Sequence, residues 1–120
     1  MSVSIPKTAI ADLVNRLLSQ TKVGKVRWKD DSTSYLNESF RTSIGVGSVT
    51  ISPATRSFPD EEGEPHFQQG FSIVVTNSNA QVVADFFSYP GDTTFDPTQE
   101  LFETARLVAR DGGMVIDSML

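Results

Sequence analysis

Apolar residues recur near the start of the chain at the spacing of one face of an α-helix. The series follows positions i, i+3, i+4, i+7, i+8 and i+11, and consists of Ile10, Leu13, Val14, Leu17, Leu18 and Thr21. Polar residues lie between them, Ser4 is a suitable helix cap and Pro6 suits a first turn. The pattern predicts an amphipathic helix of about 15 residues whose apolar face covers another element.

The middle of the chain alternates polar and apolar residues, a pattern typical of β-strands. The predicted strands are residues 25–28, 35–44, 48–52, 71–76 and 81–88. In the second of these, Leu36, Phe40 and Ile44 share the face that we expect toward the core. Tyr35 and Arg41 lie on the opposite face.

The last two predicted strands are rich in β-branched and aromatic residues, which pack well on a pleated surface. Phe86 lies on one face of residues 81–88, and Val83 and Phe87 lie on the other. We therefore expect this hairpin to lie centrally in the sheet, or its outer face to be covered as well.

The segment from Pro53 to Gly70, residues 53–70, has a different composition. It contains three prolines and an acidic cluster, and Phe58 and Phe67 are its only large apolar residues. This composition predicts a long loop, and loops of this length in compact domains are usually functional or mobile.

A second helix has a start signal near the end of the chain. We expect Asp96 as its N-cap, Pro97 at the first helical position and Gln99 three residues after the cap. Its apolar stripe consists of Leu101, Phe102, Ala105, Val108 and Ala109. The glycines at 112–113 are expected to end it, and residues 114–120 predict a last short helical turn.

The order of these elements predicts an α+β fold. An N-terminal helix precedes an antiparallel β-meander of three to five strands, and a C-terminal helix and a short terminal helical turn follow it. Because helices and strands are segregated along the chain, we expect the helices on one face of the sheet. A length of 120 residues is that of one domain, residues 1–120, and is enough to bury a core without a metal or a disulfide.

Composition and charge narrow the classes of function. The chain has no cysteine, which excludes disulfides, thiolate metal sites and cysteine nucleophiles. A formal net charge of −5 repels phosphate backbones and argues against nucleic-acid binding. The N-terminus has no signal-peptide pattern and no apolar run has membrane-spanning length, so we expect a cytoplasmic protein without a membrane partner.

The only tryptophan lies in the one basic stretch of this acidic chain, residues 22–29. The candidate ligand-binding residues there are Lys22, Lys25, Arg27 and Trp28. Cationic groups beside an aromatic face are suited to a small anionic metabolite or a nucleotide. The alternation favours another interpretation, in which Val26 and Trp28 point inward to seal the junction of helix and sheet and the cations are solvated.

No catalytic motif is present. The only histidine, His66, follows a carboxylate cluster that consists of Asp60, Glu61, Glu62 and Glu64. A hydrolase or metal-dependent site built from Asp60, Glu61, Glu62 and His66 is one hypothesis, but the spacing matches no calcium loop and a solvated acidic segment is the simpler interpretation. With one histidine and no cysteine, nucleophilic triads are hard to build. We therefore expect that the protein is not an enzyme and that it binds no metal ion and no cofactor.

Two stretches together resemble a group of small uncharacterised prokaryotic proteins. Residues 21–28 fit the segment T-x-x-G-K-[LV]-x-W, and residues 101–109 fit the helix L-[YF]-x-x-A-R-x-x-A. In that group the two motifs flank a β-meander, so the resemblance implies the same α+β architecture over most of the chain. It implies no function, because the group has no established activity.

The lack of a catalytic motif and the two-sided apolar hairpin favour a non-enzymatic interaction module. We expect it to bind a protein partner, or a second copy of itself as a homodimer, through the face or an edge of the sheet. The candidate partner-binding residues are Tyr35, Arg41, Val83, Phe87, Arg106 and Arg110. The alternative is a protein that binds or sequesters a small anionic ligand at the basic stretch.

Overall fold

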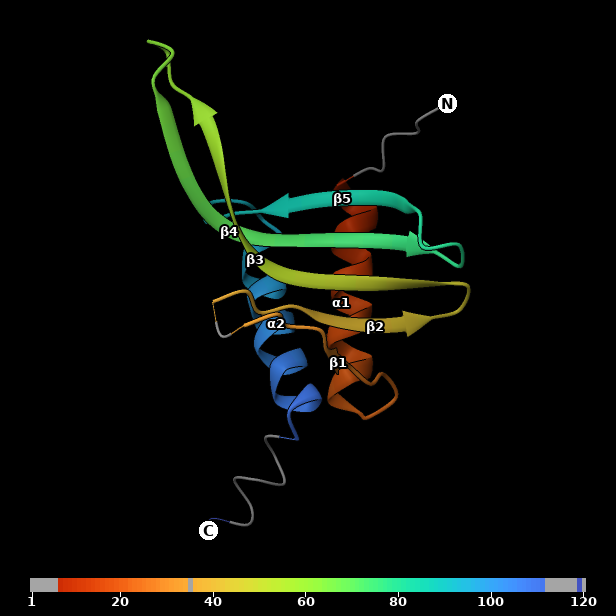
Figure 1. The fold of residues 1–120 in the computed structure, drawn as a ribbon. Coiled ribbons are helices and arrows are strands. Elements are labelled where there is room, and N and C mark those ends of the chain that lie inside the picture. The colour runs from red at the N-terminus through yellow and green to blue at the C-terminus, as the bar shows by residue number, and fades with distance from the viewer. Residues whose placement is uncertain (1–6, 35, 112–118, 120) are drawn as a thin grey trace.

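The computed structural model describes residues 7–34, 36–111 and 119. Its elements are α1 (Lys7–Lys22), β1 (Lys29–Asp30), β2 (Phe40–Ile44), β3 (Gly47–Pro59), β4 (Pro65–Asn77), β5 (Val82–Ser88) and α2 (Phe95–Ala109). The strands form one antiparallel sheet in the order β1-β2-β3-β4-β5, and both helices cover the same face of it (Figure 1). The predicted α+β fold is therefore confirmed.

A row of apolar side chains crosses the sheet beneath the helices. Phe40 on β2 pairs with Ile51, Ile51 pairs with Ile73 on β4, and Ile73 pairs with Phe86 on β5. The helices cover this row with Ile10, Val14, Leu17 and Leu18 from α1 and with Leu101, Phe102 and Ala105 from α2. Val49 and Ile51 point inward as their alternation predicts, because side chains two apart on a strand share a face.

The strand predicted over residues 35–44 begins later than expected. β2 starts at Phe40, and Leu36 lies in the preceding loop with 76% of its surface exposed instead of in the core. The Ser32 hydroxyl accepts a hydrogen bond from the Ser39 N–H at 3.0 Å, and the Asp31 N–H donates to the Ser39 carbonyl at 2.8 Å. These local bonds satisfy backbone groups that a longer strand would have used. Tyr35 lies outside the described residues.

The start of α2 also differs from the prediction. The cap is Thr94 and not Asp96, which lies in the first turn of the helix. The buried Thr94 hydroxyl pairs with the Ser88 hydroxyl at 2.8 Å and makes no capping bond. This contact ties the start of α2 to the end of β5. The predicted features at residues 4–6, 112–113 and 114–120 lie outside the described residues, apart from Met119, which is exposed.

The long loop predicted over residues 53–70 is wrong. Residues 47–59 of β3 pair continuously with residues 65–77 of β4, so most of this segment is a β-hairpin. Only residues 60–64 form a turn, in which the Asp60 N–H donates to the Glu64 carbonyl at 2.9 Å.

The prolines fit this hairpin because each occupies a position where its backbone nitrogen would not bond to the partner strand. The bond between residues 60 and 64 marks a hydrogen-bonded pair, and such pairs alternate with non-hydrogen-bonded pairs along an antiparallel ladder. Pro59 and Pro65 are cross-strand partners in a non-hydrogen-bonded pair, and Pro53 has the same phase. Proline is tolerated in a strand where its missing N–H would face away from the partner.

The basic stretch joins α1 to the sheet through a buried tryptophan. Val26 and Trp28 are both buried, as the structural interpretation of this stretch predicts. The Trp28 indole Nε1–H donates to the Thr21 hydroxyl at 2.9 Å, and that hydroxyl donates to the Leu17 carbonyl at 2.6 Å. The Thr21 side chain is therefore the polar partner that allows an indole N–H to be buried here.

We expect Thr21→Val to destabilise the protein by about 1–3 kcal/mol, because the indole N–H of Trp28 would be buried without an acceptor. Urea denaturation followed by tryptophan fluorescence measures this loss. Thr21→Ser, which keeps the hydroxyl and removes one methyl, is the control and should lose less. Equal losses for the two variants would show that the hydrogen bond contributes little.

Candidate functional site

The β3–β4 hairpin extends well beyond the rest of the sheet. β2 pairs with β3 no further than Ile51, and β5 pairs with β4 no further than Phe71. Beyond these residues the hairpin projects from the body as a two-stranded ribbon (Figure 1), which we call the arm, residues 53–70. Isolated two-stranded ribbons are marginally stable in water, so the arm needs support from the body or from a partner.

An aromatic cluster supports the outer face of the arm. The Phe58 ring lies 6.2 Å from the Phe87 ring and 6.2 Å from the Tyr89 ring, and the latter two stack at 5.9 Å. The Arg56 guanidinium lies 4.9 Å from the centre of the Phe87 ring and 3.1 Å from the Asp85 carboxylate. Phe87 is consequently buried, but Val83 on the same face is 52% exposed and β5 is an edge strand, so the predicted cover of the β4–β5 hairpin is present only at Phe87.

Gly70 lets the cluster approach the base of the arm closely. A Cβ atom at this position would meet the Phe87 ring and the Ser88 carbonyl oxygen. The missing side chain therefore makes room for Phe87 at the point where the arm leaves the sheet.

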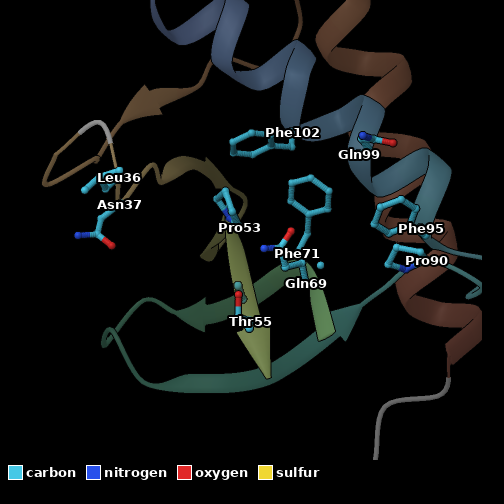
Figure 2. Close-up of a pocket in the computed structure, with 12 residues that line it drawn as sticks. Leu36, Asn37, Pro53, Thr55, Gln69, Phe71, Pro90, Phe95, Gln99 and Phe102 are labelled. Carbon is cyan, nitrogen blue, oxygen red and sulfur yellow. The ribbon is translucent and has the colours of Figure 1, made fainter. Parts of the chain in front are cut away.

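The inner face of the arm borders an open hollow of about 640 Å³. Its apolar floor is formed by Phe71 on β4 and by Phe95 and Phe102 on α2, whose rings lie 5.0–5.8 Å from that of Phe71. Figure 2 shows Leu36 and Asn37 facing these rings from the opposite side. We call this space the hollow under the arm.

The lining of this hollow combines apolar groups with amides. Among the described residues, its polar side chains are those of Asn37, Thr55, Gln69 and Gln99, and none of its lining side chains is ionisable. Leu36 at one side is 76% exposed, and Phe67, two residues beyond Gln69 on the same face of β4, is 74% exposed. Such a surface can bind an uncharged apolar group and orient it through amide hydrogen bonds.

The acidic residues lie at the tip of the arm, away from this hollow. One Asp60 oxygen accepts the N–H groups of Glu62 and Glu64 at 2.8 Å, and the other lies 3.0 Å from the His66 ring. The backbone bond from Glu64 is the main cause that lowers the pKa of Asp60. Among the described residues, no group of three histidine or acidic side chains is placed to hold a metal ion. The structure thus gives the cluster a role in forming the turn.

The candidate partner-binding residues Arg106 of α2 and Arg110 at its C-terminal cap lie in an ion-pair network within the chain. Arg110 contacts Asp30 at 2.8 Å and Glu38 at 3.0 Å, and Arg106 contacts Glu38 at 3.2 Å. The two guanidinium groups also lie over the rings of Phe40 and Phe102. This network holds β1 and the following loop against α2. Hydrogen bonds from Ser32 and Arg110 lower the pKa of Asp30 to about 2.

The remaining predicted site residues are divided between buried and exposed positions. Trp28 is buried, and Lys22 pairs with Glu100 at 2.6 Å. The exposed members are Lys25, Arg27, Arg41 and Val83. Lys25, Arg27 and Trp28 nevertheless line one open hollow at the end of α1, and Lys22 is not among its lining residues.

Sequence reasoning did not predict the hollow under the arm. The alternation predicts Leu36 in the core, Phe71 and Phe102 belong to separate predicted elements, and Phe95 precedes the predicted cap at Asp96. The one available signal was Phe67, a large apolar residue in an otherwise polar stretch.

Comparisons with known proteins give no match. No protein-family model matches the chain, and neither the curated proteins nor the solved structures contain a match to it. In the part of the chain that the structure describes, no helix combines the length and the hydropathy needed to cross a bilayer.

The lowered pKa of Asp30 predicts a specific acid sensitivity. A carboxylate whose pKa is lower in the folded state contributes stability above its ordinary pKa of 3.8 and loses that contribution as the pH falls toward about 2. We expect the free energy of unfolding to fall more steeply between these pH values in the wild type than in Asp30→Asn. Urea denaturation at a series of pH values measures both slopes, and parallel curves would contradict this expectation.

We expect Gly70→Ala to destabilise the protein by about 1–3 kcal/mol, because the added methyl group meets the Phe87 ring and backbone that cannot move freely. Chemical denaturation measures the loss. Gly63→Ala is the matched control for steric contact, since a Cβ there meets no atom within 4 Å and its cost comes from the positive φ of 81° alone. If Gly70→Ala has the same free energy of unfolding as the wild type, Phe87 does not hold the base of the arm.

Proposed function

We propose that this chain is a non-enzymatic interaction module that holds an uncharged, apolar segment of a partner protein in the hollow under the arm. The observation that carries the proposal is the exposure of Leu36 and Phe67 beside a hollow whose described lining residues carry no charge. In a chain of which 21% is charged, an uncharged concave surface of this size is suited to recognition of another apolar surface.

Burial of these side chains would supply a substantial part of the affinity. Removing a large apolar side chain such as Phe67 or Leu36 from water stabilises by about 1.5–3 kcal/mol. The amides of Asn37, Gln69 and Gln99 would pair with backbone groups of the bound segment and set its direction.

The free edge of β3 supports an extended conformation for the bound segment. By the ladder alternation, Thr55 and Ser57 direct their N–H and C=O groups away from β4, on the side where β2 has ended. Pro53 and Pro59 flank them with the same phase and have no N–H. A partner strand can therefore pair only over this short stretch, which favours a brief β-addition over open-ended sheet growth.

The same surface would serve if the partner is a second copy of this chain. Two arms exchanged between copies would each cover the hollow of the other, giving a symmetric homodimer. In the second case, and not in the first, the average molar mass of the purified protein in solution rises with its concentration.

The test uses short uncharged peptides selected by display on the wild-type protein, with affinities measured by calorimetry. We expect Phe67→Ser to weaken the selected peptides about tenfold or more, because tenfold corresponds to about 1.4 kcal/mol. The control is Val23→Ser, which removes another exposed apolar side chain, at 67% exposure, beyond the end of α1.

Both substitutions affect exposed side chains, so urea denaturation should show similar stabilities for both variants. Sedimentation over a concentration series distinguishes the homodimer, which Phe67→Ser should weaken. If Phe67→Ser and Val23→Ser affect both measurements equally, the hollow under the arm is not the binding site.

A further inference from the structure

A second hollow, also of about 640 Å³, lies between the end of α1 and the β1–β2 edge of the sheet. Its charged lining residues are Lys25, Arg27, Lys29 and Arg41. We call it the basic hollow. It shares no lining residue with the hollow under the arm, so it is a separate surface.

Three of the four cations of the basic hollow lack the ion pairs that most other described basic side chains make. Lys22, Arg56, Arg106 and Arg110 each lie within 3.2 Å of a carboxylate. Among the described side chains, Lys25, Arg27 and Lys29 have no carboxylate within 4.0 Å, and the nearest one to Arg41 is that of Asp31, at 3.8 Å. In a chain with net charge −5, three unpaired cations and the loosely paired Arg41 locally reverse the sign of the overall charge.

Two of these cations lie side by side on neighbouring strands. Lys29 and Arg41 are direct cross-strand partners on β1 and β2. Like charges in this position destabilise a sheet, so this pair lowers the free energy of unfolding of the protein without ligand. An anion bound between them would remove that cost.

Neutral hydrogen-bonding groups complete the lining. Gln20 and Ser43 border the basic hollow, and the pairing of β1 with β2 does not reach Ser43, whereas the hydroxyl of the buried Thr42 donates to the Arg27 carbonyl at 2.6 Å. Trp28 also lines the hollow, but its side chain is buried and its indole N–H donates to Thr21, so it offers little ring surface to a nucleobase. Recognition at this site would depend on charge and hydrogen bonds, without stacking.

We propose that the basic hollow binds a small multivalent oxyanion, a ligand with two or more phosphate or carboxylate groups close together. Arginine and lysine form charge-assisted hydrogen bonds with both groups. The negative charge of the rest of the chain disfavours long polyanions that would extend past the hollow, and favours compact ones. This site is independent of the proposed protein-binding surface, and each can fail without the other.

The test measures binding of tripolyphosphate and of citrate by calorimetry and by thermal shift at constant ionic strength. We expect saturable binding of at least one probe and a rise in melting temperature. Lys29→Gln should weaken that binding by about tenfold, as the loss of a charge-assisted hydrogen bond implies. Comparison of the two probes tells a phosphate ligand from a carboxylate ligand.

Arg16→Gln is the matched control. Arg16 is an exposed cation of α1 that, within the described residues, makes no ion pair and does not line the basic hollow, so its loss changes the net charge by the same amount. It should leave the affinity within about twofold of the wild type. Without ligand, Lys29→Gln should be at least as stable as the wild type, because the like-charge pair is gone.

Three outcomes would overturn the proposal. The first is that neither probe binds saturably, and the second is that Arg16→Gln and Lys29→Gln weaken probe binding equally. The third is that a single-stranded oligonucleotide binds more tightly than tripolyphosphate. Phe67→Ser should bind the probes as the wild type does, which keeps this test separate from that of the hollow under the arm.

Discussion

The register between β3 and β4 is the constraint on which the rest of the structure depends. Thirteen consecutive pairs join the two strands without interruption. At one end this register places Ile51 and Ile73 side by side under the helices, and at the other it places Pro59 opposite Pro65. Because side chains alternate between faces, a slip of one residue would expose the core row and would also bring proline into hydrogen-bonding positions. The core and the arm are therefore specified together.

The arm and the two hollows follow from how far the neighbouring strands extend. β2 and β5 stop near the base of the arm, which leaves the hairpin projecting and its inner face open above α2. β1 pairs only two residues, which leaves the basic hollow beside β2. Most other described basic side chains form ion pairs within the chain, so the basic side chains without a close carboxylate are concentrated at the β1–β2 edge of the sheet. The exposed apolar side chains Leu36 and Phe67 lie beside the hollow under the arm. This separation is why we assign the two surfaces to different kinds of partner.

The departures from the sequence predictions have local physical causes. Three prolines and an acidic cluster predicted a loop over residues 53–70, but a proline that faces away from its partner strand costs the ladder no hydrogen bond. Leu36 had the right spacing for the core, but Ser32 and Asp31 bond to the backbone of Ser39 and end the strand early. Asp96 had the stronger capping pattern, but the pairing of Thr94 with Ser88 decided where α2 begins.

The sequence by itself determined the helices, the core strands, their order and the inward direction of Trp28, because each of these depends on a periodicity that is local in the chain. Only the tertiary structure decided the extent of the β3–β4 hairpin and the composition of both hollows. Leu36 comes from a loop, Phe67 from β4 and Phe95 from α2, and the pairing of Lys29 with Arg41 depends on strand register. Such proximity between distant residues is set by pairing and packing across the whole sheet, and no local pattern records it.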